Sequence, residues 1–165
     1  MNAAETLAAF SEGTLQPAPP AGSWRLCVTG APVPKARPRA VAFNGRARVY
    51  TPGTTARYED RVRKTALRDW SFAPLRGVEL ALTVVFYLPV PVSWPRWKRQ
   101  AALAGGLRPT SKPDLDNLVK SLQDGMQGVV YEDDSAIVSK RAEKRYGDDP
   151  RVDLNLAWTL QQTRA

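Results

Sequence analysis

The most constraining feature of the sequence is the nearly continuous apolar run VELALTVVFYL at residues 78–88. A short apolar run rich in β-branched and aromatic residues is typical of a strand in the interior of a sheet. The run is too short to cross a bilayer even when it is extended to Pro91. We therefore expect the chain to fold around a sheet with this segment at its centre, and not to span a membrane.

The first half of the chain adds a strand, a hairpin and a helix to this sheet. Apolar side chains alternate over residues 24–28, which predicts a first strand. The segment AVAFNGRARVY, residues 40–50, carries Asn44-Gly45 between two strand-like runs, the pattern of a hairpin with a type I′ turn. Residues 51–70 predict a helix, because apolar residues recur four positions apart along one face.

The second half predicts two helices followed by strands. A short helix is expected at 95–104, where Gly105 ends it, and a second at 117–127. The segment VVYEDD, residues 129–134, predicts a strand that ends in acids. The alternating segments 135–147 and 151–160 predict a terminal antiparallel pair.

These elements define the fold class and the domain limits. The 165 residues suit one domain. Residues 1–22 include the Pro-rich stretch LQPAPPAGS and are expected to form a flexible tail, and residues 23–162 to form the domain. We predict an α+β fold with a mixed, mostly antiparallel sheet and two or three helices. The N-terminus lacks the basic region of a signal peptide, so we expect a cytoplasmic protein.

Two absences restrict the chemistry. The chain contains no His, which excludes a Ser-His-Asp triad and a His metal ligand. It contains one Cys, Cys27, which excludes a disulfide and a thiolate zinc site. Catalysis must therefore come from carboxylates, Lys, Arg, Tyr or hydroxyls. Carboxylates favour a hard cation such as Mg²⁺ or Mn²⁺.

Positive charge is unevenly distributed along the chain. Lys and Arg total 24 against 16 acidic residues, and the net charge of +8 favours a polyanionic partner. Residues 31–70 hold ten bases and three acids, and residues 91–112 hold five bases and no acid. Trp94 and Trp97 suit either stacking on unpaired bases or packing in the core. We expect both basic regions to bind DNA through Lys35, Arg37, Arg39, Arg46, Arg48, Arg96, Lys98, Arg99 and Lys112.

Negative charge is concentrated between Pro113 and Asp134, where six acids accompany one base, Lys120. Asp114 and Asp116 are two residues apart, so their carboxylates project to the same side of an extended segment. Two neighbouring carboxylates repel each other unless a cation lies between them. We therefore expect this pair to bind a divalent cation.

The rest of the acidic segment supplies a third ligand and a lysine. One of Glu132, Asp133 and Asp134 can face the first pair, and if the predicted strand is regular Glu132 and Asp134 point together while Asp133 points away. Lys120 shares a helix face with Asp116 and Asp124, and it is either a salt-bridge partner or a contact to a phosphate oxygen. The spacing lacks the ligand and the glycine of an EF-hand, and the chain has no P-loop.

The segment KPDLDNLVKSLQDGMQGVVYEDDSAIV, residues 112–138, resembles the signature of the RusA-type Holliday-junction resolvases of phages, prophages and some bacteria. GAPVPKARPRA, YTP and Lys144-Arg-Tyr extend the resemblance over roughly residues 24–160. It implies a small α+β fold and a homodimeric, Mg²⁺- or Mn²⁺-dependent endonuclease that nicks four-way DNA junctions in symmetric pairs. It further implies that the catalytic residues are Asp114, Asp116, Asp134 and Lys120, and that the three acids hold the metal with Asp133 as a further candidate.

Two other functions remain open at this stage. A non-catalytic module that binds DNA or junctions would use the acids structurally. A D-x-D nucleotide-sugar transferase would also bind a metal, although the small size and the charge argue against it. A homodimer requires an interface, for which the apolar strand residues Val84, Phe86 and Leu88 and the helix at 117–127 are candidates, unless they fill the core.

Overall fold

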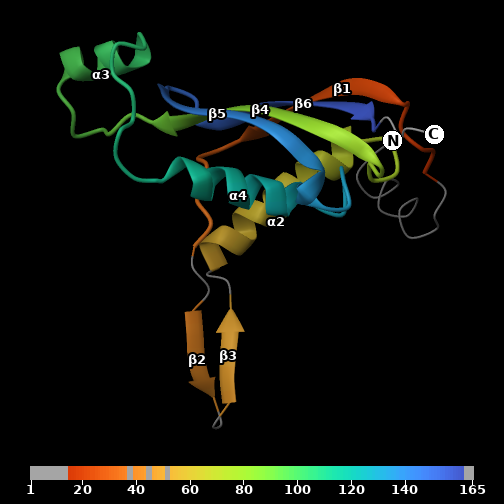
Figure 1. Ribbon diagram of the computed structural model, residues 1–165. Helices are drawn as coiled ribbons and strands as arrows, with labels where there is room; N and C mark the ends of the chain where they lie inside the picture. Colours follow the sequence, from red (N-terminus) through yellow and green to blue (C-terminus); the bar gives the residue numbers. More distant parts are fainter. Residues whose placement is uncertain (1–14, 37–38, 44–45, 51–52, 162–165) are drawn as a thin grey trace.

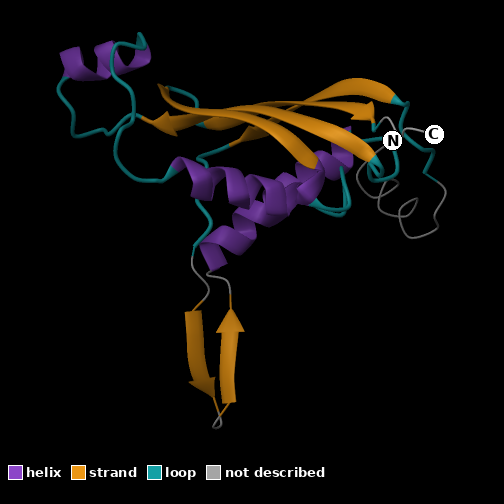
Figure 2. Ribbon diagram, in the orientation of Figure 1, coloured by secondary structure: helices purple, strands orange, loops and turns teal. Residues whose placement is uncertain are grey.

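The computed structural model describes residues 15–36, 39–43, 46–50 and 53–161, and between residues 37 and 52 it describes only the backbone of two strands. One layer is a four-stranded sheet in the order β1-β6-β4-β5. Two helices, α2 (Gly53–Asp69) and α4 (Leu115–Met126), cover one face of this sheet (Figures 1 and 2). The predicted α+β class is confirmed. The sheet strands are β1 (Ala21–Thr29), β4 (Val78–Pro89), β5 (Ile137–Gly147) and β6 (Arg151–Leu160).

The apolar run 78–88 forms β4, which lies between β6 and β5 and so occupies the predicted interior position. Its alternate side chains from Leu80 to Leu88 are buried beneath the helices, while Ala81 and Thr83 on the other face are exposed. The run is therefore covered on one side only. The apolar residues of β6 are buried on the same side of the sheet, and both strands supply the core.

The prediction that the last two strands pair with each other is wrong. β6 is antiparallel to both β1 and β4, and β5 pairs with β4 in parallel. The connection at 148–150 therefore crosses the end of β4. The reason lies in composition: β6 alternates strictly and suits an interior position, whereas β5 is rich in exposed charges, which natural sheets place at an edge. The sheet is mixed and mostly antiparallel, as predicted.

Helices α2 and α4 pack closely against each other and form the second layer of the fold. Tyr58, Val62 and Ala66 are fully buried along α2, and this is the apolar face that the four-residue spacing predicts. On α4, a Cβ atom placed on Gly125 would lie 2.6 Å from the Cβ atom of Val62. Only glycine permits this approach, so Gly125 fixes how closely the two helices pack.

Two smaller elements extend from this body. Helix α3 (Arg96–Leu103) confirms the helix expected at 95–104 and lies beyond one end of the sheet (Figure 1). Strands β2 (Arg39–Phe43) and β3 (Arg46–Tyr50) form a separate two-stranded sheet, with Phe43 paired to Arg46. The hairpin is confirmed, while the type of its Asn44-Gly45 turn lies outside the described residues. In Figure 1 the hairpin projects away from the sheet and the helices.

The sheet begins two residues before the predicted domain boundary, since Ala21 and Gly22 belong to β1. The preceding residues also contact the domain. The indole Nε1 of Trp158 donates to the carbonyl oxygen of Pro19 at 2.9 Å, and the backbone N–H of Leu160 donates to Pro20 at 2.9 Å. The described end of the predicted tail is therefore attached to β6.

Candidate active site

Asp114 and Asp116 lie at the amino end of α4. Asp114 precedes the helix with extended backbone angles (φ −68°, ψ 138°), and Asp116 lies in its first turn. The prediction of one extended segment holding both residues is therefore wrong, because the helix begins at Leu115 instead of Asn117. Aspartate is favoured both at the N-cap and in the first turn, where the helix dipole stabilises negative charge.

Both carboxylates are exposed to solvent. The side-chain amide of Asn117 donates to Oδ2 of Asp114 at 3.5 Å, at the limit of a hydrogen bond. Within the described ranges, neither Asp114 nor Asp116 forms an ion pair with Lys or Arg. The two acids therefore remain accessible to a cation from solution.

Lys144 fixes the segment that leads into this helix. Its Nζ donates to the carbonyl oxygens of Ser111 and Pro113, at 2.8 Å each. Lys144 belongs to the edge strand β5, whereas Pro113 directly precedes Asp114. The sheet thus determines where α4 begins and where the first acid is presented.

Residues 129–134 do not form a strand, so the expectation of a strand that ends in acids is wrong. Gly128 has a positive φ of 75°, and the backbone N–H groups of Val129 and Val130 return to the carbonyl oxygen of Met126. The chain therefore turns directly after α4 and makes only isolated bridges through Tyr131. The hydroxyl of Tyr131 is buried and donates to the carbonyl oxygen of Gln123 at 3.1 Å.

Asp133 and Asp134 lie after this turn, at a single turn of 3₁₀-helix (Asp134–Ala136). The side chain of Asp133 accepts a hydrogen bond from the backbone N–H of Ser135 at 2.9 Å, and contacts with the side chain and then the backbone of Ser135 lower the pKa of Asp133. Asp133 therefore caps the turn. Asp134 is less exposed and faces Lys120.

Lys120 lies between two carboxylates. Its Nζ is 2.8 Å from Oδ2 of Asp134 and 3.1 Å from Oδ1 of Asp124, one helical turn further along α4. Hydrogen bonds to Asp134 and then to Asp124 raise the pKa of Lys120. The ammonium group is therefore held in its charged form beside one of the three predicted catalytic acids.

A second lysine completes this network. The Nζ of Lys35 is 2.7 Å from Oδ2 of Asp124 and 2.6 Å from Oε1 of Glu59 on α2. Burial alone would lower the pKa of Lys35, but hydrogen bonds to Asp124 and Glu59 outweigh it and the pKa is raised. Lys35 was predicted to bind DNA, and in the structure its ammonium group contacts these two carboxylates. We call the five side chains Glu59, Lys35, Asp124, Lys120 and Asp134 the salt-bridge network.

The residue types at the site suit a hard divalent cation, because carboxylate oxygens are its usual ligands. Asp114 and Asp116 are open to solvent, whereas Asp134 already contacts the ammonium group of Lys120. In the described part of the chain, no three ligating side chains lie close enough together to hold a metal ion. A site built from Asp114, Asp116 and Asp134 therefore remains a prediction.

Comparison with known proteins shows which family the chain belongs to. A family model described as Endodeoxyribonuclease RusA matches residues 29–157. The chain belongs to the RusA endodeoxyribonuclease family. It is 33% identical over 132 residues to the uncharacterized protein YqaN of Bacillus subtilis (strain 168), an alignment that covers 79% of this chain and 92% of YqaN. It is also 36% identical over 84 residues to a crossover junction endodeoxyribonuclease of Lactococcus phage r1t, covering 49% of this chain and 56% of that protein.

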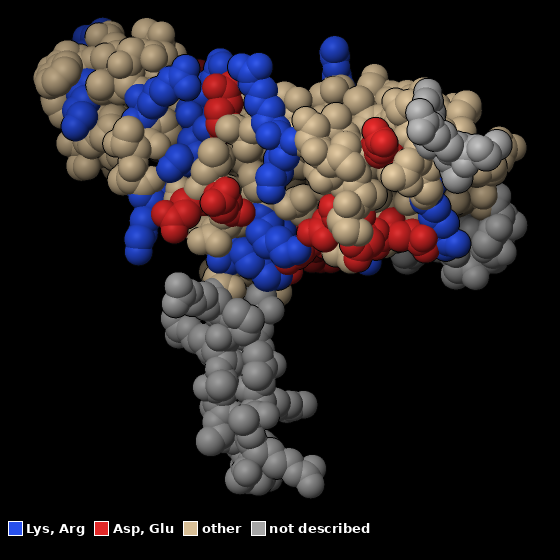
Figure 3. All heavy atoms as spheres, in the orientation of Figure 1, with Lys and Arg blue, Asp and Glu red and all other residues tan. Residues whose placement is uncertain are grey.

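Within this RusA-family chain, the predicted DNA-binding residues other than Lys35 fall into three groups. Arg37, Arg39, Arg46 and Arg48 have side chains outside the described residues. Arg96, Arg99 and Lys112 are exposed, and in Figure 3 basic side chains gather between α3 and α4, beside the acidic side chains along α4. Lys98 lies over the ring of Trp94 at 4.1 Å from its centroid.

The two tryptophans near α3 have different environments. Trp94 packs edge-on against Tyr146, with ring centroids 5.3 Å apart, and so serves as a structural side chain. Trp97 is 68% exposed, which leaves its ring open to stacking on an unpaired base. No helix in the described ranges has the length and apolar character that crossing a membrane requires.

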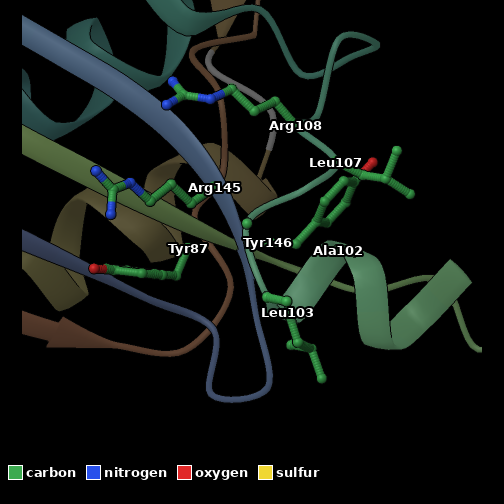
Figure 4. Close-up of a pocket in the computed structure, with 9 residues that line it drawn as sticks. Tyr87, Ala102, Leu103, Leu107, Arg108, Arg145 and Tyr146 are labelled. Carbon is green, nitrogen blue, oxygen red and sulfur yellow. The ribbon is translucent and has the colours of Figure 1, made fainter. Parts of the chain in front are cut away.

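A hollow of about 290 Å³ lies between α3 and the ends of β4 and β5. Arg108, Arg145 and Tyr87 extend to one side of it, and Leu103 and Leu107 line the other (Figure 4). Glu143 bonds to Arg145 at 2.6 Å and lies 3.6 Å from Arg108. The two arginines add to the basic surface of this RusA-family chain, although they were not among the predicted DNA-binding residues.

Sequence reasoning missed the contacts of Lys35 with Glu59 and Asp124 and those of Lys144 with Ser111 and Pro113. The four-residue spacing of Lys120 and Asp124 indicated that they meet, and the structure confirms this contact. The contacts of Lys35 and Lys144 join residues distant in the chain, so no local pattern predicts them.

Proposed function

We propose that this protein is a divalent-metal-dependent endonuclease that resolves four-way DNA junctions by paired, symmetric nicks. The observation that carries the proposal is the pair of exposed carboxylates, Asp114 and Asp116, at the start of α4. Lys120 of the same helix forms an ion pair with Asp134. Membership of an endodeoxyribonuclease family supports nuclease activity. The name of the phage relative supports a junction as the substrate.

Asp114, Asp116 and Asp134 would hold Mg²⁺ or Mn²⁺. Such an ion, when bound, polarises a phosphate and lowers the pKa of a water molecule. The chain's own groups orient the reaction. The start of α4, anchored by Lys144, presents the first two acids, and the protonated Lys120 is available to a phosphate oxygen or a leaving oxygen. The exposed bases Arg96, Arg99 and Lys112 would bind the DNA backbone.

The paired nicks require two active sites, because one chain supplies one D-x-D cluster. A two-fold symmetric homodimer is the simplest assembly that places two sites on related strands. Val84, Phe86 and Leu88 are buried in the core, so the dimer would use another surface. Light scattering of the free and junction-bound protein should give a dimer, and a monomer in both states would rule out this assembly.

Cleavage of labelled DNA tests the whole proposal. The wild-type protein should nick a four-way junction in Mg²⁺, leave linear duplex uncut and bind without cutting in Ca²⁺. Asp114→Asn and Asp116→Asn should each reduce nicking by at least about 10³-fold, the scale lost with a group that acts in the transition state, while junction binding persists. Asp153→Asn on β6 is the control and should cut normally.

A protein that binds junctions but never nicks them in Mg²⁺ or Mn²⁺ would be the non-catalytic binding module. Cutting that persists in excess EDTA would exclude the metal mechanism.

A further inference from the structure

The proposed metal ligand Asp134 already has a cationic partner in the structure. Its Oδ2 lies 2.8 Å from the Nζ of Lys120. A divalent ion and an ammonium group cannot occupy the same position on one carboxylate oxygen, because their like charges repel at that distance. A metal ion on the other oxygen, Oδ1, would still lie within a few ångströms of the ammonium group and repel it, so metal binding at Asp134 would weaken its contact with Lys120.

Asp124 provides a second position for the lysine. Its Oδ1 is 3.1 Å from the Nζ of Lys120, so the ammonium group already contacts both carboxylates. Moving from Asp134 to Asp124 therefore requires little movement of the lysine. The side chain of Lys120 is 49% exposed, and no tight packing restricts this shift.

The rest of the salt-bridge network holds Asp124 where it can accept Lys120. Asp124 uses its other oxygen, Oδ2, to contact Lys35 at 2.7 Å, and Lys35 is held in turn by Glu59 at 2.6 Å. The two lysines therefore do not compete for one oxygen atom. The side chain of Asp124 is only 19% exposed, and the close packing of α2 and α4 holds it next to Glu59.

We propose that Lys120 is the resident counter-ion of Asp134, and that a divalent cation displaces it onto Asp124, which acts as a positioning residue. The inference rests on the metal site under the proposed function. It assigns a role to Asp124 and couples metal loading to the position of Lys120. The metal-free site keeps Asp134 neutralised, and the loaded site holds Lys120 on Asp124 with its remaining N–H groups open to substrate.

Mn²⁺ affinity, measured by calorimetry in the absence of DNA, tests this competition. Lys120→Met removes the competitor, so Mn²⁺ should bind about three- to five-fold more tightly, the range expected for one partly exposed ion pair. Asp124→Asn removes the second position for Lys120, so Mn²⁺ should bind several-fold more weakly. Asp153→Asn makes the same charge change beside Arg151 on β6 and should leave the affinity unchanged.

The double variant separates competition from simple electrostatics. If Asp124 acts only through Lys120, then adding Asp124→Asn to Lys120→Met should change Mn²⁺ affinity by less than two-fold. If each charge acts on the metal independently, the two effects should add. Additive effects, or a Lys120→Met variant with wild-type affinity, would overturn the proposal.

A spectroscopic measurement on the wild-type protein gives a second test. The ¹³Cε resonance of Lys120, assigned by its loss in Lys120→Met, should shift when Mg²⁺ is added to the wild-type protein. It should not shift in Asp134→Asn. A resonance that stays unchanged while Mg²⁺ binds would contradict displacement, whereas failure of the wild-type protein to bind Mn²⁺ or Mg²⁺ at all would refute the metal site itself.

Discussion

The ammonium of Lys144 lies 2.8 Å from the carbonyl oxygen of Pro113, and this contact ties the edge of the sheet to the residue before Asp114. The lysine also bonds to Ser111 at the same distance, so a single side chain satisfies two carbonyl groups of the segment that enters α4. Lys144 touches no proposed ligand. We therefore expect Lys144 to affect catalysis only through the position that it gives to Asp114.

We expect Lys144→Met to reduce nicking by about 10- to 100-fold, because small displacements of catalytic groups have effects of this size. The loss should fall mainly on kcat, with the junction affinity within about two-fold of wild type. Single-turnover cleavage and a binding titration measure the two quantities. Lys140→Met, an exposed lysine of the same strand, is the control. An equal loss in both variants would show that strand charge, and not the tether, is responsible.

Gly125→Ala should destabilise the protein by about 1–3 kcal/mol, the usual cost of overpacking. The added methyl group would lie 2.6 Å from Val62, between α2 and α4. Thermal unfolding measures the loss, and adding Val62→Ala should recover part of it because space becomes available. Gly53→Ala near the start of α2 meets nothing closer than 4.0 Å and should be neutral or stabilising. A neutral Gly125→Ala would mean that the helices separate easily.

The contribution of Asp124 to stability should disappear in acid. Burial alone would raise the pKa of the Asp124 carboxyl, but hydrogen bonds from Lys35 and Lys120 outweigh it and lower the pKa below the ordinary value of 3.8. A lowered pKa in the folded state means that the stabilisation is complete above 3.8 and is lost as the pH falls through the lower folded value.

The difference in unfolding free energy between wild type and Asp124→Asn should therefore be constant from pH 7 to about pH 5 and shrink below pH 4. Urea unfolding across this range measures it. Asp60→Asn, which breaks an exposed pair with Lys64, should change stability by less than about 1 kcal/mol throughout. A difference that widens in acid would contradict the assignment.

Junction binding should weaken steeply with salt, and the exposed bases of α3 should account for part of the slope. Each phosphate contact adds about −0.9 to the slope of log K against log salt on duplex DNA. If Arg96 and Arg99 each contact one phosphate, the double alanine variant should reduce the slope by about 1.8. Arg68→Ala, whose guanidinium is held by Asp69, should leave the slope unchanged. A slope near zero in the wild-type protein would remove the argument from the basic surface.

Local patterns were enough to predict each long element and the class of the fold. The nearly continuous apolar content of residues 78–88 indicated an interior strand, and β4 occupies that position. The same patterns could not show that β6 inserts between β1 and β4, because alternation describes the faces of a strand and not its neighbours. Spacing also could not separate an extended D-x-D from a helix start, since Asp suits both.

The candidate site shows the same division between local and distant contacts. The meeting of Lys120 with Asp124 follows from helical spacing. The partners of Lys35 lie on α2 and α4, and Gly125 allows these helices to pack closely, so no local pattern predicts the ion pairs of this lysine. A segment expected to be a strand turned at Gly128 instead, yet it still brought Asp134 to Lys120.

The order of strands in the sheet has a consequence for how the protein folds during synthesis. The only sheet partner of β1 within the described residues is β6, whose pairing joins Ala21 to Thr159. A nascent chain can therefore form α2 and α4 by local contacts, but β1 must wait until β6 has left the ribosome. Such distant pairing slows folding and leaves strand edges exposed in the meantime. The sheet becomes complete only when β6 is available, and the apolar face of β1 stays exposed until then.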